Sequence, residues 1–124
     1  MVNNQNEFNE KYSHEEQEIK IRYKKFQGQL VIGNYPKLER LQLLKVNSID
    51  KITLRNLVQL QECTIQGCSV VELVIENCSQ IKTLNVRNNS LTNLEFLINL
   101  EKLEVLELDG NPELIEILKP YQGD

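Results

Sequence analysis

Pairs of apolar residues separated by one position recur about every eleven residues along most of this chain of 124 residues. Side chains at i and i+2 point the same way in an extended strand, so each pair predicts a short β-strand with one buried face. Two strands per unit of about 22 residues predict a solenoid of stacked parallel strands. The pairs are Ile19/Ile21, Leu30/Ile32, Leu41/Leu43, Ile52/Leu54, Cys63/Ile65, Leu73/Ile75, Leu84/Val86, Leu106/Leu108 and Ile115/Ile117.

The flanking segments differ from this repeating middle. Residues 1–17 are polar, with Phe8 and Tyr12 spaced for one helical face, and we predict an N-terminal lead-in or weak cap over the first coil. The run Ser13-His-Glu-Glu16 fits a capping box, which would start a second short helix. The solenoid itself is predicted over 18–119, and a C-terminal tail over 120–124.

Two segments carry a more specific pattern. IKTLNVRNNSL, which starts at Ile81, and LEVLELDGNPEL, which starts at Leu103, fit L-x-x-L-x-L-x-x-N, with Ile81 and Val86 at two of the leucine positions of the first segment. They resemble the leucine-rich repeat family, in its short 22-residue subclass. The irregular part from Ile19 to Ser79 resembles a nested variety with two strands per unit. The resemblance implies an α/β, strand-rich solenoid with a concave parallel sheet, a partly strand-lined convex face and little helix.

The asparagines of these two segments, Asn89 and Asn111, have a structural role to play at the turns. A buried amide side chain can both donate to and accept from backbone groups that a turn leaves unpaired. Val46 and Cys68 occupy the same phase in earlier coils. We therefore predict looser or shifted turns at those two positions.

Three cysteines raise the question of a metal or redox site. Cys63, Cys68 and Cys78 form no Cys-x-x-Cys motif, and the single histidine, His14, lies far upstream. Their phase in the repeat predicts small, buried, reduced side chains, which suit a reducing compartment. We predict no metal site and no cofactor.

Overall charge and hydropathy restrict the partners and the location that we expect for the protein. The formal net charge of −4 disfavours non-specific binding to nucleic acid or to an anionic membrane. The N-terminus lacks the basic and apolar regions of a signal peptide, and no apolar stretch is long enough to span a bilayer. We predict a cytoplasmic protein without nucleic-acid or membrane partners, either a monomer or part of a longer chain.

The strands near 19, 41, 63, 84 and 106 fall in register, and we predict that they form the concave sheet. Their outward side chains mix both charges with amides and an exposed leucine, a combination that suits recognition of a protein or peptide. Convex Val31 and Val74 form a rival patch. The candidate partner-binding residues are Arg40, Gln42, Leu44, Glu62, Thr64, Gln66, Asn85, Arg87, Glu107 and Asp109.

Catalytic constellations are missing from the pattern. No serine, histidine and acid can be assembled within the coils, and no glycine-rich phosphate loop precedes a helix. The sequence therefore predicts a non-catalytic protein-interaction module. One alternative is a targeting or regulatory repeat segment of a larger protein such as a kinase, since the ending LKPYQGD has no evident amphipathic cap. Another is a parallel β-helix that acts on carbohydrate.

Overall fold

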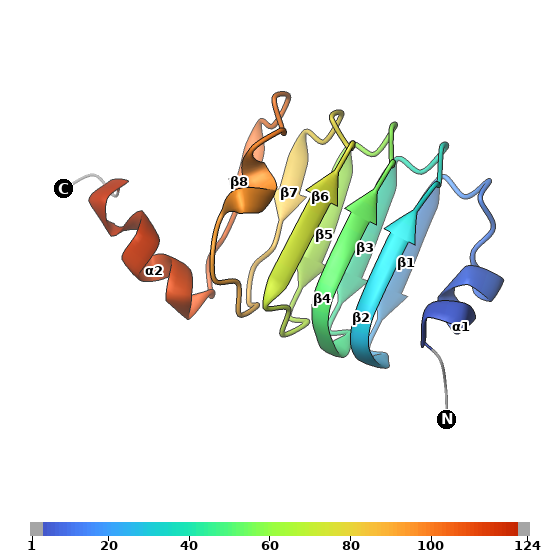
Figure 1. Cartoon of the computed structure of the whole chain (residues 1–124), viewed down its shortest axis with the longest axis horizontal. Helices are drawn as coiled ribbons and strands as arrows, with labels where there is room; N and C mark the ends of the chain where they lie inside the picture. The colour runs from blue at the N-terminus through green and yellow to red at the C-terminus, as the bar shows by residue number, and fades with distance from the viewer. Residues whose placement is uncertain (1–3, 122–124) are drawn as a thin grey trace.

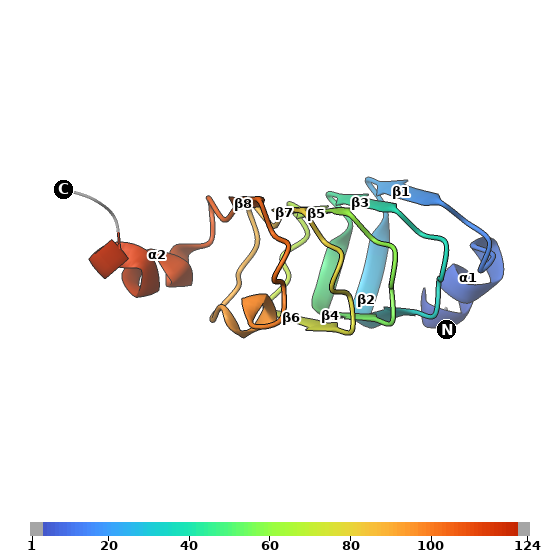
Figure 2. The same cartoon turned by 90° about the horizontal axis from the view of Figure 1, so that it is seen from above.

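The computed structural model describes residues 4–121 and shows a β-solenoid of about four turns. Two walls of stacked parallel strands face each other across a narrow core (Figure 1, Figure 2); the first three coils contribute a strand to both walls, and the later coils to one only. One wall, the five-stranded sheet, has the order β1-β3-β5-β7-β8, and the other, the three-stranded sheet, has the order β2-β4-β6. The strands are β1 (Glu18–Arg22), β2 (Lys25–Gly33), β3 (Arg40–Leu44), β4 (Asn47–Arg55), β5 (Glu62–Gln66), β6 (Glu72–Glu76), β7 (Thr83–Asn85) and β8 (Val105–Glu107).

The predicted alternation of walls is confirmed by the strand register. Leu41 lies between Ile19 and Cys63 across the five-stranded sheet, and Leu84 lies between Cys63 and Leu106. The same one-to-one matching joins the strands of the three-stranded sheet, apart from an irregularity near Gly28. Equivalent residues of successive coils therefore form straight columns along the solenoid.

Helical segments occupy the two ends and one side of the stack. They are α1 (Asn4–Lys11), the 3₁₀ turn η1 (Glu95–Leu97), α2 (Pro112–Leu118) and the 3₁₀ turn η2 (Lys119–Tyr121). Of the predicted tail over 120–124, residues 122–124 lie outside the described part of the chain. The strand predicted from Ile115/Ile117 is wrong, because this pair belongs to α2 and is 55% and 40% exposed. Pro112 at the first turn favours a helix, and Leu114 and Leu118 supply its inward face at helical spacing.

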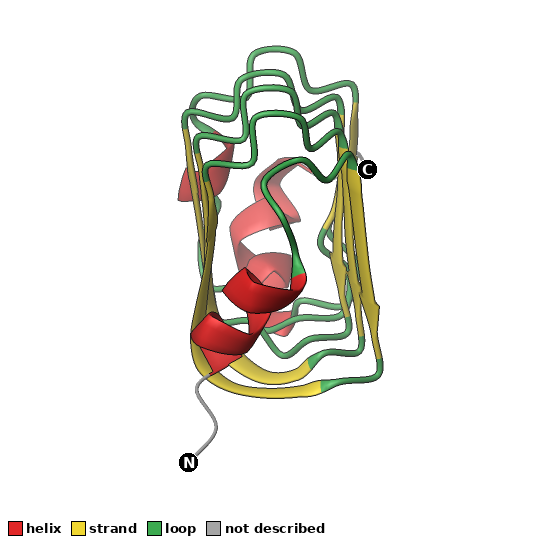
Figure 3. Cartoon of the chain, turned by 90° about the vertical axis from the view of Figure 1, so that its right-hand side faces the viewer, coloured by secondary structure: helices red, strands yellow, loops and turns green. Residues whose placement is uncertain are grey.

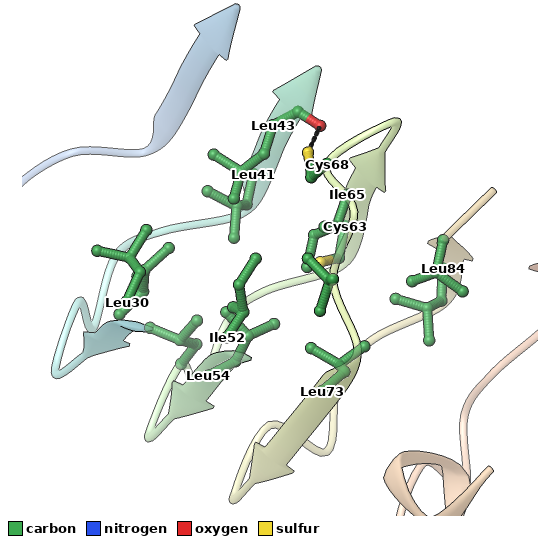
Figure 4. Close-up of a cluster of buried hydrophobic side chains, with 14 of the residues drawn as sticks. Leu30, Leu41, Leu43, Ile52, Leu54, Cys63, Ile65, Cys68, Leu73 and Leu84 are labelled. Atoms are coloured by element: carbon green, nitrogen blue, oxygen red, sulfur yellow. Dashed lines mark hydrogen bonds between the residues drawn. The ribbon is translucent and has the colours of Figure 1, made fainter. Parts of the chain in front are cut away.

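The core is a single column of apolar side chains between the two sheets. Leu43, Leu54 and Leu84 are fully buried, and Figure 4 shows side chains of both walls meeting in the middle. In the last coil the packing ends: Leu106 is 36% exposed, whereas its counterparts in the other four strands are buried. No further strand follows β8 in the described chain to cover it.

Helix α1 covers the other end of the stack, in front of the first coil in Figure 3. Phe8 is buried, and its ring lies 4.9 Å from that of Tyr12 and 6.0 Å from that of Tyr35. The second helix predicted after Ser13 is absent from the described residues. Ser13 caps only a single turn, in which the amide of Glu15 donates to its Oγ and the amide of Glu16 to its carbonyl.

The turns after the five-stranded sheet repeat one geometry. Their first residues share a left-handed backbone, with φ between 53° and 80°, and they are Tyr23, Lys45, Gly67, Asn88 and Gly110. The amide of Lys45 donates to the carbonyl of Gln66 in the next coil, at 2.9 Å, and the amides of Tyr23, Gly67 and Asn88 form the equivalent bond. The prediction of looser turns at Val46 and Cys68 is therefore wrong. The turn is held by backbone bonds between coils, which any side chain permits.

Buried side chains reinforce these turns, as predicted for Asn89 and Asn111. The Oδ1 of Asn89 accepts from the amides of Cys68 and Val70, and its Nδ2 donates to the carbonyl of Ile65 at 2.7 Å. Asn111 repeats the pattern one coil later, where its Oδ1 accepts from the amide of Leu91. In an earlier coil Cys68 occupies the position of these asparagines, and its thiol is the donor: Sγ lies 3.5 Å from the carbonyl oxygen of Leu43 (Figure 4).

A second asparagine ladder, which the sequence pattern did not predict, follows the three-stranded sheet on the outside of its turns. Asn34, Asn56 and Asn77 all have left-handed backbones. The Nδ2 of Asn56 donates to the Oδ1 of Asn34 at 3.1 Å, and that of Asn77 donates to the Oδ1 of Asn56 at 2.9 Å.

All three cysteines are buried and unpaired, as their phase predicted. Burial raises the pKa of all three thiols, and raises that of Cys63 to about 12. Within residues 4–121, no group of three or more His, Cys, Asp and Glu side chains is placed to hold a metal ion.

Replacing Leu84 by alanine should lower the free energy of unfolding by about 2–5 kcal/mol, because the truncation leaves a cavity between two covered coils. Leu106→Ala is the matched control in the same column. Its effect should be about half as large or less, because Leu106 is already partly in water. Urea denaturation measures both. Equal losses, or a loss below about 0.5 kcal/mol for Leu84→Ala, would contradict the register.

The raised thiol pKa of Cys63 predicts a stability that falls at high pH. The unfolded thiol ionises near its ordinary pKa of 9.0, whereas the folded thiol keeps its proton until about 12. The unfolded state therefore binds fewer protons between these values, and each such thiol lowers the unfolding free energy by roughly 1 kcal/mol per pH unit. Cys63→Ala should show a shallower decline than the parent chain between pH 9 and 11. Identical slopes would contradict the prediction, as would fast labelling of the native thiols by a water-soluble reagent.

Candidate interaction surface

The outer face of the five-stranded sheet presents three rows of side chains, because every second residue of a strand points away from the core. The middle row contains Lys20, Gln42, Thr64, Asn85 and Glu107, which are paired in register from β1 to β8. This row and its two flanking rows form one continuous surface across five strands.

The ten predicted site residues all come together on this face. Eight of them lie on β3, β5, β7 and β8, while Arg87 and Asp109 follow the last residues of β7 and β8 by two positions. Most are half-buried by their neighbours, and only Arg40, Glu62 and Asp109 are exposed. Alternation along the strands was sufficient to place them.

Cross-coil contacts hold these side chains in place, which the sequence could not predict. The Nε of Arg40 donates to the Oε2 of Glu18 at 3.1 Å, and Arg87 forms an ion pair with Glu107. The amide of Asn85 donates to the Oε1 of Gln66 at 3.2 Å. The two candidate arginines are thus already paired within the molecule, each with an acid of a neighbouring coil.

Charge is distributed unevenly along the face. Lys20 and Arg22 lie on β1 with one acid, Glu18; within residues 4–121 Arg22 forms no ion pair and donates to the Oε1 of Gln42. Glu107 and Asp109 lie at the other end, on and after β8. A partner that matched this gradient would be acidic over β1 and basic over β8.

A shallow hollow of about 230 Å³ lies at the basic end of the face. Charges of both signs surround it, with Lys20 and Arg40 set against Glu18 and Glu62. Its volume is near the lower limit of small-ligand pockets, so it suits one side chain of a partner better than a whole cofactor. Glu18 and Lys20 were not among the candidate residues, although they have the same outward phase on β1 as Arg40 and Gln42 on β3.

The only histidine lies away from this face. The ring of His14 stacks on that of Tyr35 at 4.7 Å, and its Nδ1 hydrogen-bonds with the carbonyl of Asn34. The three cysteines are buried in the core. The face therefore displays amides, hydroxyls, carboxylates and cations, which are groups suited to binding by hydrogen bonds and ion pairs.

No protein-family model, curated protein or solved structure matches the chain. In the described residues, no helix has the length and apolar character needed to cross a bilayer. The functional assignment therefore depends on the fold and on the chemistry of its surfaces.

Proposed function

We propose that this chain is a non-catalytic interaction module of the leucine-rich repeat type, which binds a protein or peptide on the outer face of the five-stranded sheet. The observation that carries the proposal is the continuous face of five strands in register, with fixed polar side chains and half-buried Leu44 among them. Leu44 supplies an apolar contact, and the surrounding charges and amides orient the partner.

Two features favour the leucine-rich repeat over the parallel β-helix that stays an alternative. The amides of Asn89 and Asn111 bond the backbone of adjacent coils at equivalent turns. The coil after β7 also replaces its second strand by the turn η1, where the leucine-rich extension of the pattern lies. The three-stranded sheet is the feature that the two architectures share.

Preorganisation is the physical advantage of such a face. Strands fix the backbone, and cross-coil bonds such as Arg40 to Glu18 and Asn85 to Gln66 restrict the side chains before a partner arrives. Less conformational entropy is then lost on binding. The proposal gives the face no catalytic role.

A photo-crosslinking residue placed at Thr64, in the middle of the face, tests the proposal without knowledge of the partner. We expect ultraviolet irradiation in a cell extract to link the chain repeatedly to the same protein. The matched control carries the crosslinker at Val31, on the outer face of the opposite sheet, and should not capture that protein. Repeated recovery of polysaccharide or RNA at Thr64 would contradict the proposal.

With the partner identified, Arg40→Glu combined with Arg87→Glu should weaken its affinity by at least about 1 kcal/mol, because the reversed charges oppose the partner's. Isothermal titration calorimetry measures this. The unfolding free energy should fall by about 2 kcal/mol or less, since each reversal removes one surface ion pair and leaves two carboxylates side by side. If the double variant and Leu44→Ala bind normally while Val31→Ala loses the partner, the opposite sheet is the binding face.

A further inference from the structure

The edges of the two sheets are covered to different degrees. At the β2 edge, the side chain of Gln5 takes the place of a neighbouring strand: its Nε2 donates to the carbonyl oxygen of Val31 at 2.8 Å, and its Oε1 accepts from the amide of Val31 at 2.7 Å. At the β6 edge, the coil with η1 packs beside the strand, where Leu73 and Phe96 are buried. In the described chain, the β8 edge of the five-stranded sheet has neither kind of cover.

The backbone of β8 bonds to β7 with every second residue. The amide of Val105 donates to the carbonyl of Lys82. The carbonyl of Glu107 accepts from the amide of Val86. Because bonding groups alternate in direction along a strand, the N–H and C=O of Leu106, between these two residues, point away from β7. In the described part of the chain, no turn, loop or helix bonds to the backbone of Leu106.

Helix α2 does not occupy the position beside β8. It projects away from the stack in Figure 1, and in Figure 2 it lies between the levels of the two sheets. The backbones of α2 and β8 stay apart, and only the first turn of the helix packs into the core, through Leu114. The described chain therefore leaves the place of a sixth strand empty.

The same end of the solenoid leaves apolar side chains in water. Four of the nine large apolar side chains that are exposed in the described chain lie here, namely Val105, Leu106, Ile115 and Ile117. The counterparts of Leu106 in the other coils are buried. A strand added beside β8 would cover Leu106 in the way that β8 covers Leu84.

The outward side chains at this edge are acidic. Glu107 and Asp109 both pair with a single cation, Arg87, so one negative charge of this group is not balanced. A cation on the outward face of an added strand would lie beside these carboxylates, as Arg40 lies beside Glu18 between β3 and β1. Two copies of the chain joined through their β8 edges would instead bring the acids of both to one interface, which disfavours a second copy as the occupant.

We propose that the β8 edge binds an extended peptide segment in which apolar residues alternate with lysine or arginine, and that this segment adds to the sheet as a sixth strand parallel to β8. Its main chain exchanges hydrogen bonds with the N–H and C=O of Leu106. One apolar side chain packs on Leu106, and the cations reach Glu107 and Asp109. Binding at this edge does not depend on binding at the outer face of the sheet.

The probe is the acetylated and amidated peptide Thr-Ile-Lys-Ile-Arg, mixed with the full chain and followed by amide hydrogen exchange in nuclear magnetic resonance. Its first isoleucine lies beside Leu106 in the proposed register, and its lysine beside Glu107. We expect saturable binding and at least tenfold slower exchange at the amide of Leu106, with no change on the three-stranded sheet. No saturation at millimolar peptide, or protection confined to other strands, would overturn the proposal.

Single N-methyl groups on the peptide test the pairing of main chains. The N–H of the lysine faces the carbonyl of Leu106, so methylation there should weaken binding at least tenfold. The N–H of the first isoleucine points away from β8. Methylation at that position is the matched control, and it should change the affinity less than twofold. Equal losses from the two methyl groups would contradict the proposal.

Variants of the chain test the role of charge. Asp109→Lys should weaken binding of the peptide at least fivefold. Asp50→Lys, at an exposed position on β4 of the opposite sheet, is the matched control of equal charge change and should bind as the parent does. If the free chain protects the amide of Leu106 in proportion to its own concentration, the occupant is a second copy and the peptide proposal is wrong.

Discussion

The one-to-one backbone pairing between successive coils is the constraint on which every other feature depends. The amides of four left-handed turn residues after the five-stranded sheet donate to the next coil, as that of Lys45 does to the carbonyl of Gln66, and the strands on either side stay in register. A slip by one residue would turn Leu41 and Leu43 to solvent and Gln42 into the core. The same pairing aligns the outward residues into rows. The same strand register thus determines both the residues of the core and the residues of the candidate interaction surface.

Much of this arrangement could be predicted from the sequence, because a period of two is a local signal. Leu84 and Cys63 were placed in the core, and Thr64 and Gln66 on the surface, by their phase alone. The prediction was wrong where two periodicities coexist: Ile115/Ile117 fits a strand, but Pro112, Leu114 and Leu118 favour a helix. The turns at Val46 and Cys68 were mispredicted because backbone bonds to the next coil hold them, and at Cys68 the side chain of Asn89 and the thiol itself supply further bonds.

On the surface, too, the positions of residues could be predicted from the sequence, but their contacts could not. The positions of Arg40 and Arg87 followed from alternation, but their pairing with Glu18 and Glu107 required the stacking of coils. The end of the three-stranded sheet at β6 could not be predicted from the sequence, because the apolar residues from Leu94 to Leu97 fit a strand as well as the 3₁₀ turn η1 that the structure has there.

The uneven covering of the two ends has a mechanical consequence. At the first coil, α1 closes the stack with Phe8 and with the bonds from Gln5, so tension on this end meets packed aromatic rings. At the last coil, a strand of three residues carries a partly exposed Leu106. Because each coil touches only its neighbours, a pull on the C-terminal end would detach α2 first, then β8 and then β7, one coil at a time. The molecule would lengthen in discrete steps of one coil, while the coils next to α1 stayed folded.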